Sequence, residues 1–279
     1  MGGQAGKLYL VGTPIGNLED ITLRALRTLR EVDLIACEDT RHTQTLLTHY
    51  QIEKPTVSYH EHNELTRAPE LILRLEEGEN IALVSDAGMP GISDPGHRLI
   101  SLCVRHGVAV IPVPGASAFL AALAASGLPT HPFRFHGFLP PKKGQRRKLL
   151  EEFKDIVRTQ IFYEAPHRLL ETLVDIAEVM GNRHVVVARE VTKLHEEFLR
   201  GRVLDVLKEL RQRDRVKGEI TLLVDRPDHV PPPQASASIK ERVDQVMKDQ
   251  KLKKMDALKQ VAKERGIPKA QAYKEYEKN

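Results

Sequence analysis

Short apolar runs alternate with amphipathic segments over the first 225 or so residues of the chain. A short run without polar alternation is typical of a strand that is buried on both faces. In the N-terminal half the predicted strands are residues 8–11, 34–37, 81–85 and 108–113. The segments between them carry apolar residues at helical spacing, and Thr22 can cap the first of these helices. This alternation predicts a largely parallel sheet with its chemistry at the carboxyl ends of the strands.

Glycine and proline gather at residues 127–141, and a second alternating set follows them. Its predicted strands are 133–139, 160–163, 185–189 and 219–224, and its predicted helices are 169–180 and 203–210. We therefore expect two α/β lobes with a cleft between them, residues 1–118 and 119–228. The proline-rich residues 229–238 predict a stiff linker, and residues 239–279 predict a small basic helical module.

Composition narrows the class of protein. The chain contains no apolar run of about 18 residues, so no membrane span is predicted, and its N-terminus lacks the apolar stretch of a signal peptide. Cys37 and Cys103 both lie in apolar surroundings without a CxxC partner, which favours buried thiols over a disulfide or a zinc site. These features predict a cytoplasmic protein.

Positive charge is unevenly distributed along the chain. Residues 239–279 carry 12 Lys and Arg against 7 Asp and Glu, whereas the rest of the chain carries 30 against 31. A second basic cluster spans residues 142–148. Segregated positive charge favours a polyanionic partner such as nucleic acid, and a solvated helical face explains it equally well.

Four turn motifs follow predicted strands, at residues 12–17, 85–96, 113–118 and 163–168. The first is neither GxGxxG, because Pro14 removes an N–H that a pyrophosphate would use, nor a P-loop. In the second, glycines, prolines and aspartates form a constrained loop in which a carboxylate can hold a ligand's hydroxyl or amino groups. Capping of the next helix by Ser93 or Asp94 is the alternative. Small residues in the third motif permit a planar group to approach the backbone.

Together these motifs resemble, in order and spacing, those of the tetrapyrrole (corrin/porphyrin) methylase superfamily. The sequences that carry the resemblance are GTPIGN (12–17), SDAGMPGISDPG (85–96), VPGASA (113–118), YEAPHR (163–168) and Gly218-Glu219-Ile220. Within that superfamily, EDTRH (38–42) and EAPHR (164–168) are similar to the bacterial ribosomal RNA small subunit methyltransferase I family. The resemblance covers Lys7 to about Asp225 and extends to the helical tail. It implies 2′-O-methylation of a cytidine in the decoding region of small-subunit (16S) rRNA.

The resemblance also implies a cofactor and an assembly. The cofactor is S-adenosylmethionine, bound in a folded conformation in the cleft between the two lobes, and the assembly is a homodimer. The implied cofactor contacts are Pro14, Ser85, Asp86, Ala87, Ile92, Ser117, His131, Pro132, Tyr163, Gly218, Ile220 and Thr221.

Methyl transfer to a ribose requires alignment of the hydroxyl and removal of its proton. Glu38, Asp39 and Arg41 directly follow the strand at 34–37, so we expect them at the rim that carries the cofactor loops and take them as candidate catalytic residues. His42, Glu164 and His167 are further candidate bases. A cap and ion-pair cluster that opens a helix explains residues 38–42 equally well, so the base is left open.

The substrate side of the site is predicted from basic residues, because guanidinium groups suit phosphate oxygens. The expected RNA contacts are Arg41, Lys142, Lys143, Arg146, Arg147, Lys148 and Arg168. Residues 142–148 are interpreted as an RNA-facing loop, with a solvated helix start as the alternative. His60 and His62 have no third ligand at a recognisable spacing, so no metal site is predicted.

Two rival functions are consistent with parts of the pattern. One is a sister enzyme that methylates a tetrapyrrole or another small molecule, which needs no basic helical tail. The other is a non-catalytic RNA-binding protein on the same scaffold, which needs no intact cofactor loops. The EDTR, EAPHR, Ser85-Asp86 and VPGAS sequences favour the rRNA methyltransferase over both.

Overall fold

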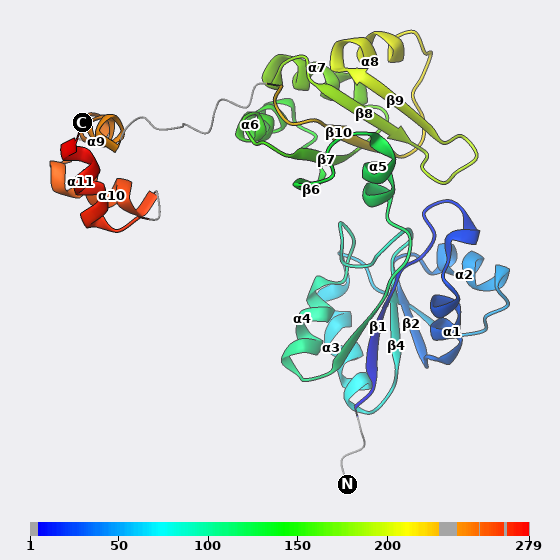
Figure 1. The fold of residues 1–279 in the computed structure, drawn as a ribbon. Coiled ribbons are helices and arrows are strands. Elements are labelled where there is room, and N and C mark those ends of the chain that lie inside the picture. Colours follow the sequence, from blue (N-terminus) through cyan, green and yellow to red (C-terminus); the bar gives the residue numbers. More distant parts are fainter. Residues whose placement is uncertain (1–4, 229–238, 251, 265–266, 279) are drawn as a thin grey trace. The chain divides into compact units, whose positions relative to one another are not determined.

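The computed structural model describes residues 5–228, 239–250, 252–264 and 267–278. They form two compact units, Met1–Pro227 and Asp228–Asn279, and the first unit contains two α/β lobes (Figure 1). The proline-rich stretch 229–238, interpreted above as a linker, lies outside the described residues.

The first lobe is built on a parallel sheet of five strands with the order β3-β2-β4-β1-β5. The strands are β1 (Lys7–Val11), β2 (Leu34–Cys37), β3 (Thr56–Ser58), β4 (Ile81–Val84) and β5 (Ala109–Val113). The helices are η1 (Leu18–Asp20), α1 (Leu23–Glu31), α2 (Thr40–His49), α3 (Glu64–Glu76) and α4 (His97–Arg105). The side chain of Thr22 caps α1, as the sequence predicts.

Helices cover both faces of this sheet, α3 and α4 on one side and α1 and α2 on the other (Figure 1). Successive residues of β2 alternate between the two cores: Leu34 and Ala36 belong to one, Ile35 and Cys37 to the other. Strands buried on both faces need no polar alternation, which is why uninterrupted apolar runs identified them. The edge strand β3 is only half-buried and carries no such run, so the sequence did not predict it.

The second lobe contains a mixed sheet with the order β6-β7-β10-β8-β9. The strands are β6 (Phe133–Phe138), β7 (Thr159–Glu164), β8 (His184–Arg189), β9 (Glu197–Arg202) and β10 (Ile220–Val224). Only β6 and β7 pair in parallel, so the expectation of a largely parallel sheet is wrong for this lobe. A buried strand has the same apolar run whether it is parallel or antiparallel to its neighbours. The sequence did not predict β9, which is a polar edge strand that pairs antiparallel with β8.

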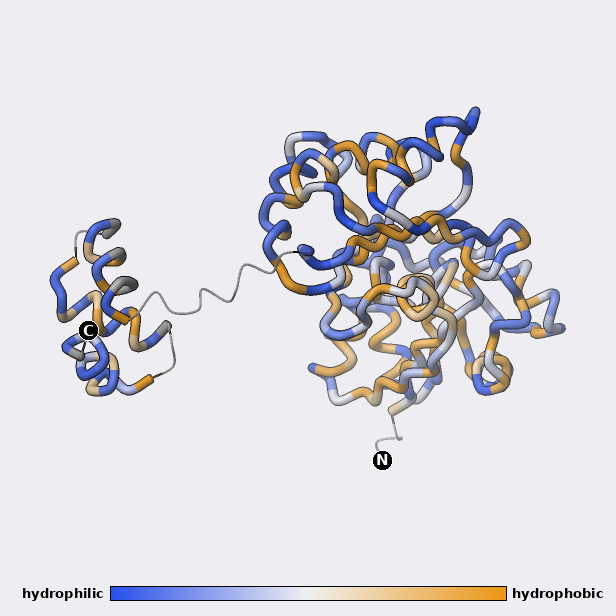
Figure 2. The backbone as a smooth tube through the Cα atoms, turned by 45° about the horizontal axis from the view of Figure 1, so that its top comes forward, coloured by the Kyte–Doolittle hydropathy of each residue, from blue (hydrophilic) through white to orange (hydrophobic). Residues whose placement is uncertain are grey.

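Helices also cover both faces of the second sheet. They are α5 (Ala118–Ser126), α6 (Lys143–Phe153), α7 (Leu169–Met180) and α8 (Val203–Leu210). The last three pack on one face, and α5 packs on the other together with Ile15 from the first lobe. In Figure 2 hydrophobic positions concentrate along the strands inside each lobe. Because Ile15 belongs to this second core, the loop after β1 in the first lobe packs into the second lobe.

The second unit is a small helical module. Its helices are α9 (Ile239–Gln250), α10 (Lys254–Glu264) and α11 (Lys269–Lys278), and they share a core of their own around Val243, Leu258 and Val261. None of the helices in the described part of the chain is long and apolar enough to cross a bilayer.

The loops after β1 and β5 approach each other so closely that a side chain at the contact would collide with backbone. A Cβ atom on Gly12 would lie 2.8 Å from the backbone of Gly115, and one on Gly115 would lie 2.8 Å from the backbone of Gly12. The Gly12 N–H donates to Val113 O over 3.0 Å, which locks this approach. Two glycines are needed here because backbone atoms cannot move aside for a methyl group.

We expect Gly12→Ala to lower the free energy of unfolding by about 1–3 kcal/mol, because the added methyl must displace backbone. Gly144→Ala is the matched control, since nothing lies within 4 Å of a Cβ at this position in α6. That control should be neutral or stabilising by up to about 1 kcal/mol. Urea denaturation of both variants measures the difference, and equal midpoints would contradict the close approach.

Candidate active site

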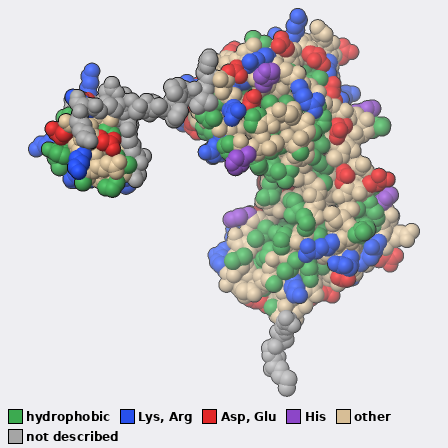
Figure 3. Space-filling model, viewed as in Figure 1, with side chains coloured by type: hydrophobic (Ala, Val, Ile, Leu, Met, Phe, Trp, Pro, Cys, Tyr) green, Lys and Arg blue, Asp and Glu red, His purple; other side chains and the backbone are tan. Residues whose placement is uncertain are grey.

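A cavity of about 710 Å³ lies between the two lobes, and loops that follow strands of both sheets line it. A volume in this range is typical of sites for cofactors and small molecules. Figure 3 shows hydrophobic side chains gathered where the lobes meet. The lining residues are Ile15, Ala87, Gly88, Met89, Ile92, Ser93, Asp94, Pro112, Pro114, Gly115, Ser117, Ala118, Phe119, Leu120, Phe138, Tyr163, Glu164, Ala165, Pro166, Val191, Gly218, Glu219, Ile220 and Thr221.

Hydrogen bonds to one threonine hold the first-lobe loops together. The Thr13 N–H donates to Gly88 O and the Gly88 N–H donates to Thr13 O, over 2.9 and 3.2 Å. The Thr13 hydroxyl lies 3.1 Å from Ser85 O, to which it donates. Thr13 is buried and serves the loops themselves, whereas Ile15 reaches the cavity.

The loop between β4 and α4 presents its later residues to the cavity. Helix α4 begins after Gly96, which has φ +147° and offers no side-chain cap. Neither Ser93 nor Asp94 therefore caps the helix, and both line the cavity. Ser93 is one of the few non-glycine residues with positive φ, +62°. Such conformations cost free energy and concentrate at functional sites, which favours the ligand-loop interpretation over the cap.

Three carboxyl groups gather at the first-lobe side of the cavity. Burial raises the pKa of Asp94 to about 7, and the nearby charges of Glu38 and Asp86 add to the effect. Burial likewise raises the pKa of Glu38, with further contributions from Asp86 and Glu61. The mutual repulsion of these groups makes this wall a favourable place for a cation.

The second lobe supplies a wall that can donate hydrogen bonds. Burial raises the pKa of Tyr163 to about 12, and the charge of Asp94 across the cavity contributes, so the phenol keeps its proton at neutral pH. Gly218 has φ +91°, and a Cβ there would meet the side chain of Glu190 at 2.5 Å. Glu190 in turn accepts the Glu219 N–H over 2.9 Å, which fixes the turn before β10.

The structure brings seven of the predicted cofactor contacts together at the cavity: Ala87, Ile92, Ser117, Tyr163, Gly218, Ile220 and Thr221. The others do not line it. Pro14 is buried, and His131 and Pro132 are exposed. Ser85 donates to Gly88 O over 3.3 Å, and Asp86 accepts the Asp39 N–H over 3.1 Å, so both shape the loops.

Sequence reasoning missed Asp94 and Phe138 as cavity residues. For Asp94 the signal was present, in the constrained loop of residues 85–96, but the residue was considered only as a cap. Phe138 carried no signal, because its orientation depends on an irregularity in β6 that strand periodicity does not reveal.

The EDTR sequence contributes to two features: Asp39 caps helix α2, and Glu38 belongs to the acidic wall. Asp39 caps α2 by accepting the Arg41 N–H over 2.8 Å, and its carboxylate forms an ion pair with the Arg41 guanidinium. Hydrogen bonds from Arg41 lower the pKa of Asp39. Arg41 itself is 91% exposed and lines a shallow groove with Gln44 and several threonines. Of the three candidate catalytic residues, Glu38 alone has a carboxyl group inclined to hold a proton.

The EAPHR turn is held from within. Glu164 is buried and accepts hydrogen bonds from the Thr172 hydroxyl and the Ala165 N–H, over 2.6 and 2.7 Å. Arg168, predicted to bind phosphate, lies 2.8 Å from Glu164 Oε1 and is only 15% exposed. Its guanidinium neutralises Glu164 and fixes the turn beside the cavity.

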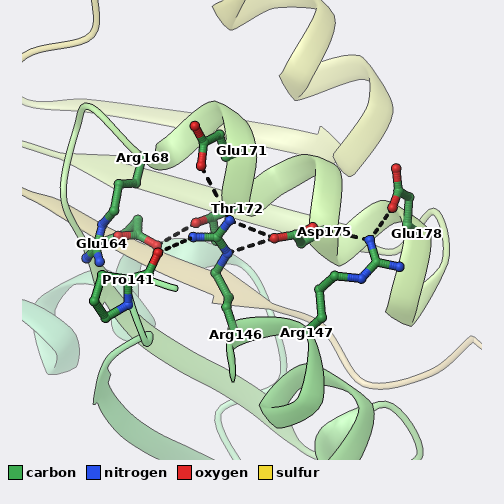
Figure 4. Close-up of polar contacts among 9 residues, drawn as sticks. All are labelled: Pro141, Arg146, Arg147, Glu164, Arg168, Glu171, Thr172, Asp175 and Glu178. Carbon is green, nitrogen blue, oxygen red and sulfur yellow. Dashed lines mark hydrogen bonds and ion pairs between the residues drawn. The ribbon is translucent and has the colours of Figure 1, made fainter. Parts of the chain in front are cut away.

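The prediction that Arg146 and Arg147 contact RNA from a loop is corrected by the structure (Figure 4). Both lie in helix α6, where Arg146 is fully buried and its guanidinium contacts Asp175 at 2.7 Å. Arg147 pairs with Asp175 and Glu178. Five positive charges in the seven residues 142–148 suggested a polyanion partner, but the acidic residues of α7 neutralise two of them.

The lysines of that stretch remain exposed. The side chains of Lys142, Lys143 and Lys148 have no partner among the residues that the structure describes. His60 forms hydrogen bonds with Asn63, and its ring lies edge-to-face against the ring of His62. No group of three or more potential metal ligands occurs within the described residues.

Comparison with known proteins identifies similar chains. Residues 7–207 match the family model of the Tetrapyrrole (Corrin/Porphyrin) Methylases. A Halalkalibacterium halodurans protein named ribosomal RNA small subunit methyltransferase I is 51% identical over 275 residues, covering 97% of this chain and 94% of that protein. A Thermotoga maritima protein of the same name is 53% identical over 219 residues, covering 78% and 98%. The structure of uroporphyrin-III C-methyltransferase from Thermus thermophilus, complexed with S-adenyl homocysteine, has the same fold: TM-score 0.55, 20% identity, 78% and 97% coverage.

We expect Asp175→Asn to lower the free energy of unfolding by about 3 kcal/mol or more, because it leaves the buried Arg146 charge without its main partner. Glu178→Gln removes a half-exposed partner of Arg147 and should cost less than about 1 kcal/mol. Urea denaturation of both variants tests the contrast. A small cost for Asp175→Asn would mean that Arg146 is compensated elsewhere.

Proposed function

This chain belongs to the ribosomal RNA small subunit methyltransferase I family of the tetrapyrrole methylases, and on that basis we propose that it methylates the 2′-hydroxyl of a cytidine in the decoding region of 16S rRNA. The methyl donor is S-adenosylmethionine. The same proposal has the enzyme act in the cytoplasm, as a homodimer, on 16S rRNA within the small ribosomal subunit.

The observation that carries the proposal is the cavity shared by the two lobes, with its acidic wall. S-adenosylmethionine has a cationic sulfonium and an amino group, and Asp94 offers them a carboxylate. Ser117 and Ala118 leave room for a planar adenine next to the backbone, and Tyr163 offers a hydroxyl from the opposite wall. The residues present therefore fit this cofactor in size, charge and shape.

S-adenosylmethionine, when bound, supplies an activated methyl group, so the protein's tasks are to align the acceptor and remove its proton. We propose that the Glu38 carboxylate accepts the proton that the ribose hydroxyl loses. Burial and the neighbouring acids raise the pKa of Glu38, which favours uptake of a proton. Asp39 is the weaker acceptor, because its carboxylate is engaged by Arg41 and by the start of α2. Arg41, almost fully exposed beside it, is available to a phosphate.

The substrate class is supported by the names of the relatives and by exposed basic residues. Two rRNA methyltransferases are more than 50% identical to this chain, whereas the tetrapyrrole methyltransferase shares its fold at 20% identity. The exposed lysines of residues 142–148 and Arg41 offer positive charge to a phosphate backbone.

The direct test incubates the protein with methyl-labelled S-adenosylmethionine and with 30S subunits, free 16S rRNA or a precorrin acceptor. We expect label in the RNA, within a dinucleotide that resists alkaline hydrolysis, because a 2′-O-methyl group removes the nucleophile that cleaves the adjacent phosphodiester. Label only in the precorrin would overturn the proposal in favour of a small-molecule methyltransferase.

Glu38→Gln is the matched variant for the chemical step, because it preserves shape and removes the proton acceptor. It should lower kcat by about 10²-fold or more while the Kd for S-adenosylmethionine changes little. Glu61→Gln, which neutralises an exposed neighbour, is its control.

The affinity for S-adenosylmethionine should depend on pH through Asp94. Since the pKa of Asp94 is about 7 without a bound cation, binding below pH 7 requires loss of a proton, and the affinity should rise between pH 6 and pH 8. Asp94→Asn should bind at least about tenfold more weakly and lose this pH dependence. Calorimetric titration at several pH values tests both, with Glu219→Gln, a 73% exposed cavity carboxylate, as control. A pH-independent wild-type Kd would refute the assignment.

A further inference from the structure

Strand β6 contains an extra residue next to the cavity. Phe135 pairs with Ile161 of β7 and Phe138 pairs with Tyr163, so three steps along β6 match two steps along β7. Gly137 makes this possible with φ +69°, a conformation that L side chains rarely adopt. Such a β-bulge redirects the side chains that follow it, and bulges are common beside active sites.

The bulge changes the face on which Phe138 lies. His136 stacks on Phe153 and Phe162, on the side of the sheet covered by α6 and α7. Regular alternation would place residue 138 on that same side. The register instead places Phe138 with Phe135 and Tyr163, and its ring lies 5.5 Å from the Tyr163 ring at the cavity wall.

Phe138 remains exposed in this position. Its exposed fraction is 60%, although the cavity lies beside it. A Cβ at Gly137 would come within 3.2 Å of Ser93 Oγ, so the bulge lies against the first-lobe loop that also lines the cavity. The ring therefore lies at the rim of the cavity beside Tyr163, and most of the residue is exposed.

Two exposed lysines follow the ring at a defined separation. Lys142 and Lys143 are at the start of α6, and Lys142 is four positions after Phe138, a reach of at most about 14 Å. The connecting loop is anchored because the buried Arg146 guanidinium approaches Pro141 O at 3.5 Å and pairs with Asp175 (Figure 4). The arrangement presents an aromatic face and positive charge together, the combination that proteins use to bind single-stranded nucleic acid.

We propose that Phe138 stacks on a base of the RNA at the mouth of the cavity while Lys142 and Lys143 contact the adjoining phosphates. The ring then fixes the nucleotide whose ribose enters the cavity, and the lysines fix the strand that carries it. This proposal rests on the proposed function, because it specifies how the same site holds its RNA.

The adenine of the cofactor is the competing planar partner for Phe138. S-adenosylmethionine carries one carboxylate and no phosphate, whereas an RNA strand offers a phosphate at every nucleotide, so two adjacent lysines beyond the ring suit the RNA better. A rim position with 60% exposure also suits a ligand that arrives from outside the cavity. These features favour the RNA base.

The test compares Phe138→Ala with Phe138→Tyr and Phe133→Ala in the full-length protein. Phe133 is the matched control, an exposed phenylalanine in the same strand that does not line the cavity. The measurements are the KM for 30S subunits and the Kd for S-adenosylmethionine. We expect Phe138→Ala to raise the KM roughly tenfold and leave the Kd within twofold, and the other two variants to behave like the wild type.

The lysines are tested by the double variant Lys142→Ala/Lys143→Ala against Lys148→Ala, which removes exposed charge from the same helix. The double variant should raise the KM for subunits several-fold and make it less sensitive to salt, whereas Lys148→Ala should change both less.

Each outcome decides the proposal. A weaker Kd for S-adenosylmethionine in Phe138→Ala with an unchanged KM for subunits would assign the ring to the cofactor and overturn it. Unchanged values of both would also overturn it, while label transfer by the wild type would leave the proposed function standing. Failure of the wild type to label RNA would reject the proposed function itself.

Discussion

The site depends on one constraint: the backbones of the loops after β1 and β5 lie so close together that neither loop has room for a Cβ atom at the contact. Gly12 and Gly115 meet at the carboxyl ends of β1 and β5, and Thr13 ties the same point to the loop after β4. This contact sets the position of Ile15, which packs in the core of the second lobe. The cavity exists between the sheets because the first lobe's strand-end loops are drawn together here and the second lobe is packed against them.

Acidic and basic groups are separated around that cavity. Carboxyl groups crowd the first-lobe wall, where burial and mutual repulsion raise the pKa of Glu38 and bring the pKa of Asp94 to about 7. On the opposite wall Tyr163 keeps its proton. The buried positive charges are paired, Arg168 with Glu164 and Arg146 with Asp175, whereas Lys142 and Lys143 are exposed. A cationic cofactor inside and a polyanionic substrate outside fit this separation.

The sequence predicted what depends on local pattern. Buried strands such as β2 and β4, the helices at residues 169–180 and 203–210, and strand-end loops with Ala87 and Tyr163 at the cavity were readable from apolar runs and turn motifs. Strand direction in the second sheet was not, because an apolar run looks the same in both directions. The burial of Arg146 depends on acids 29 residues away in α7, and the orientation of Phe138 depends on one bulge. Both features depend on contacts with other elements of the fold, which a local sequence pattern does not reveal.

Amide hydrogen exchange of the wild-type protein, with and without S-adenosyl homocysteine, tests whether loops of both lobes form a single cofactor site. We predict slower exchange in two separate sets of peptides, one covering residues 85–96 and 112–120 and the other covering residues 163–166 and 218–221. Protection confined to one lobe, or found only in residues 239–279, would contradict it.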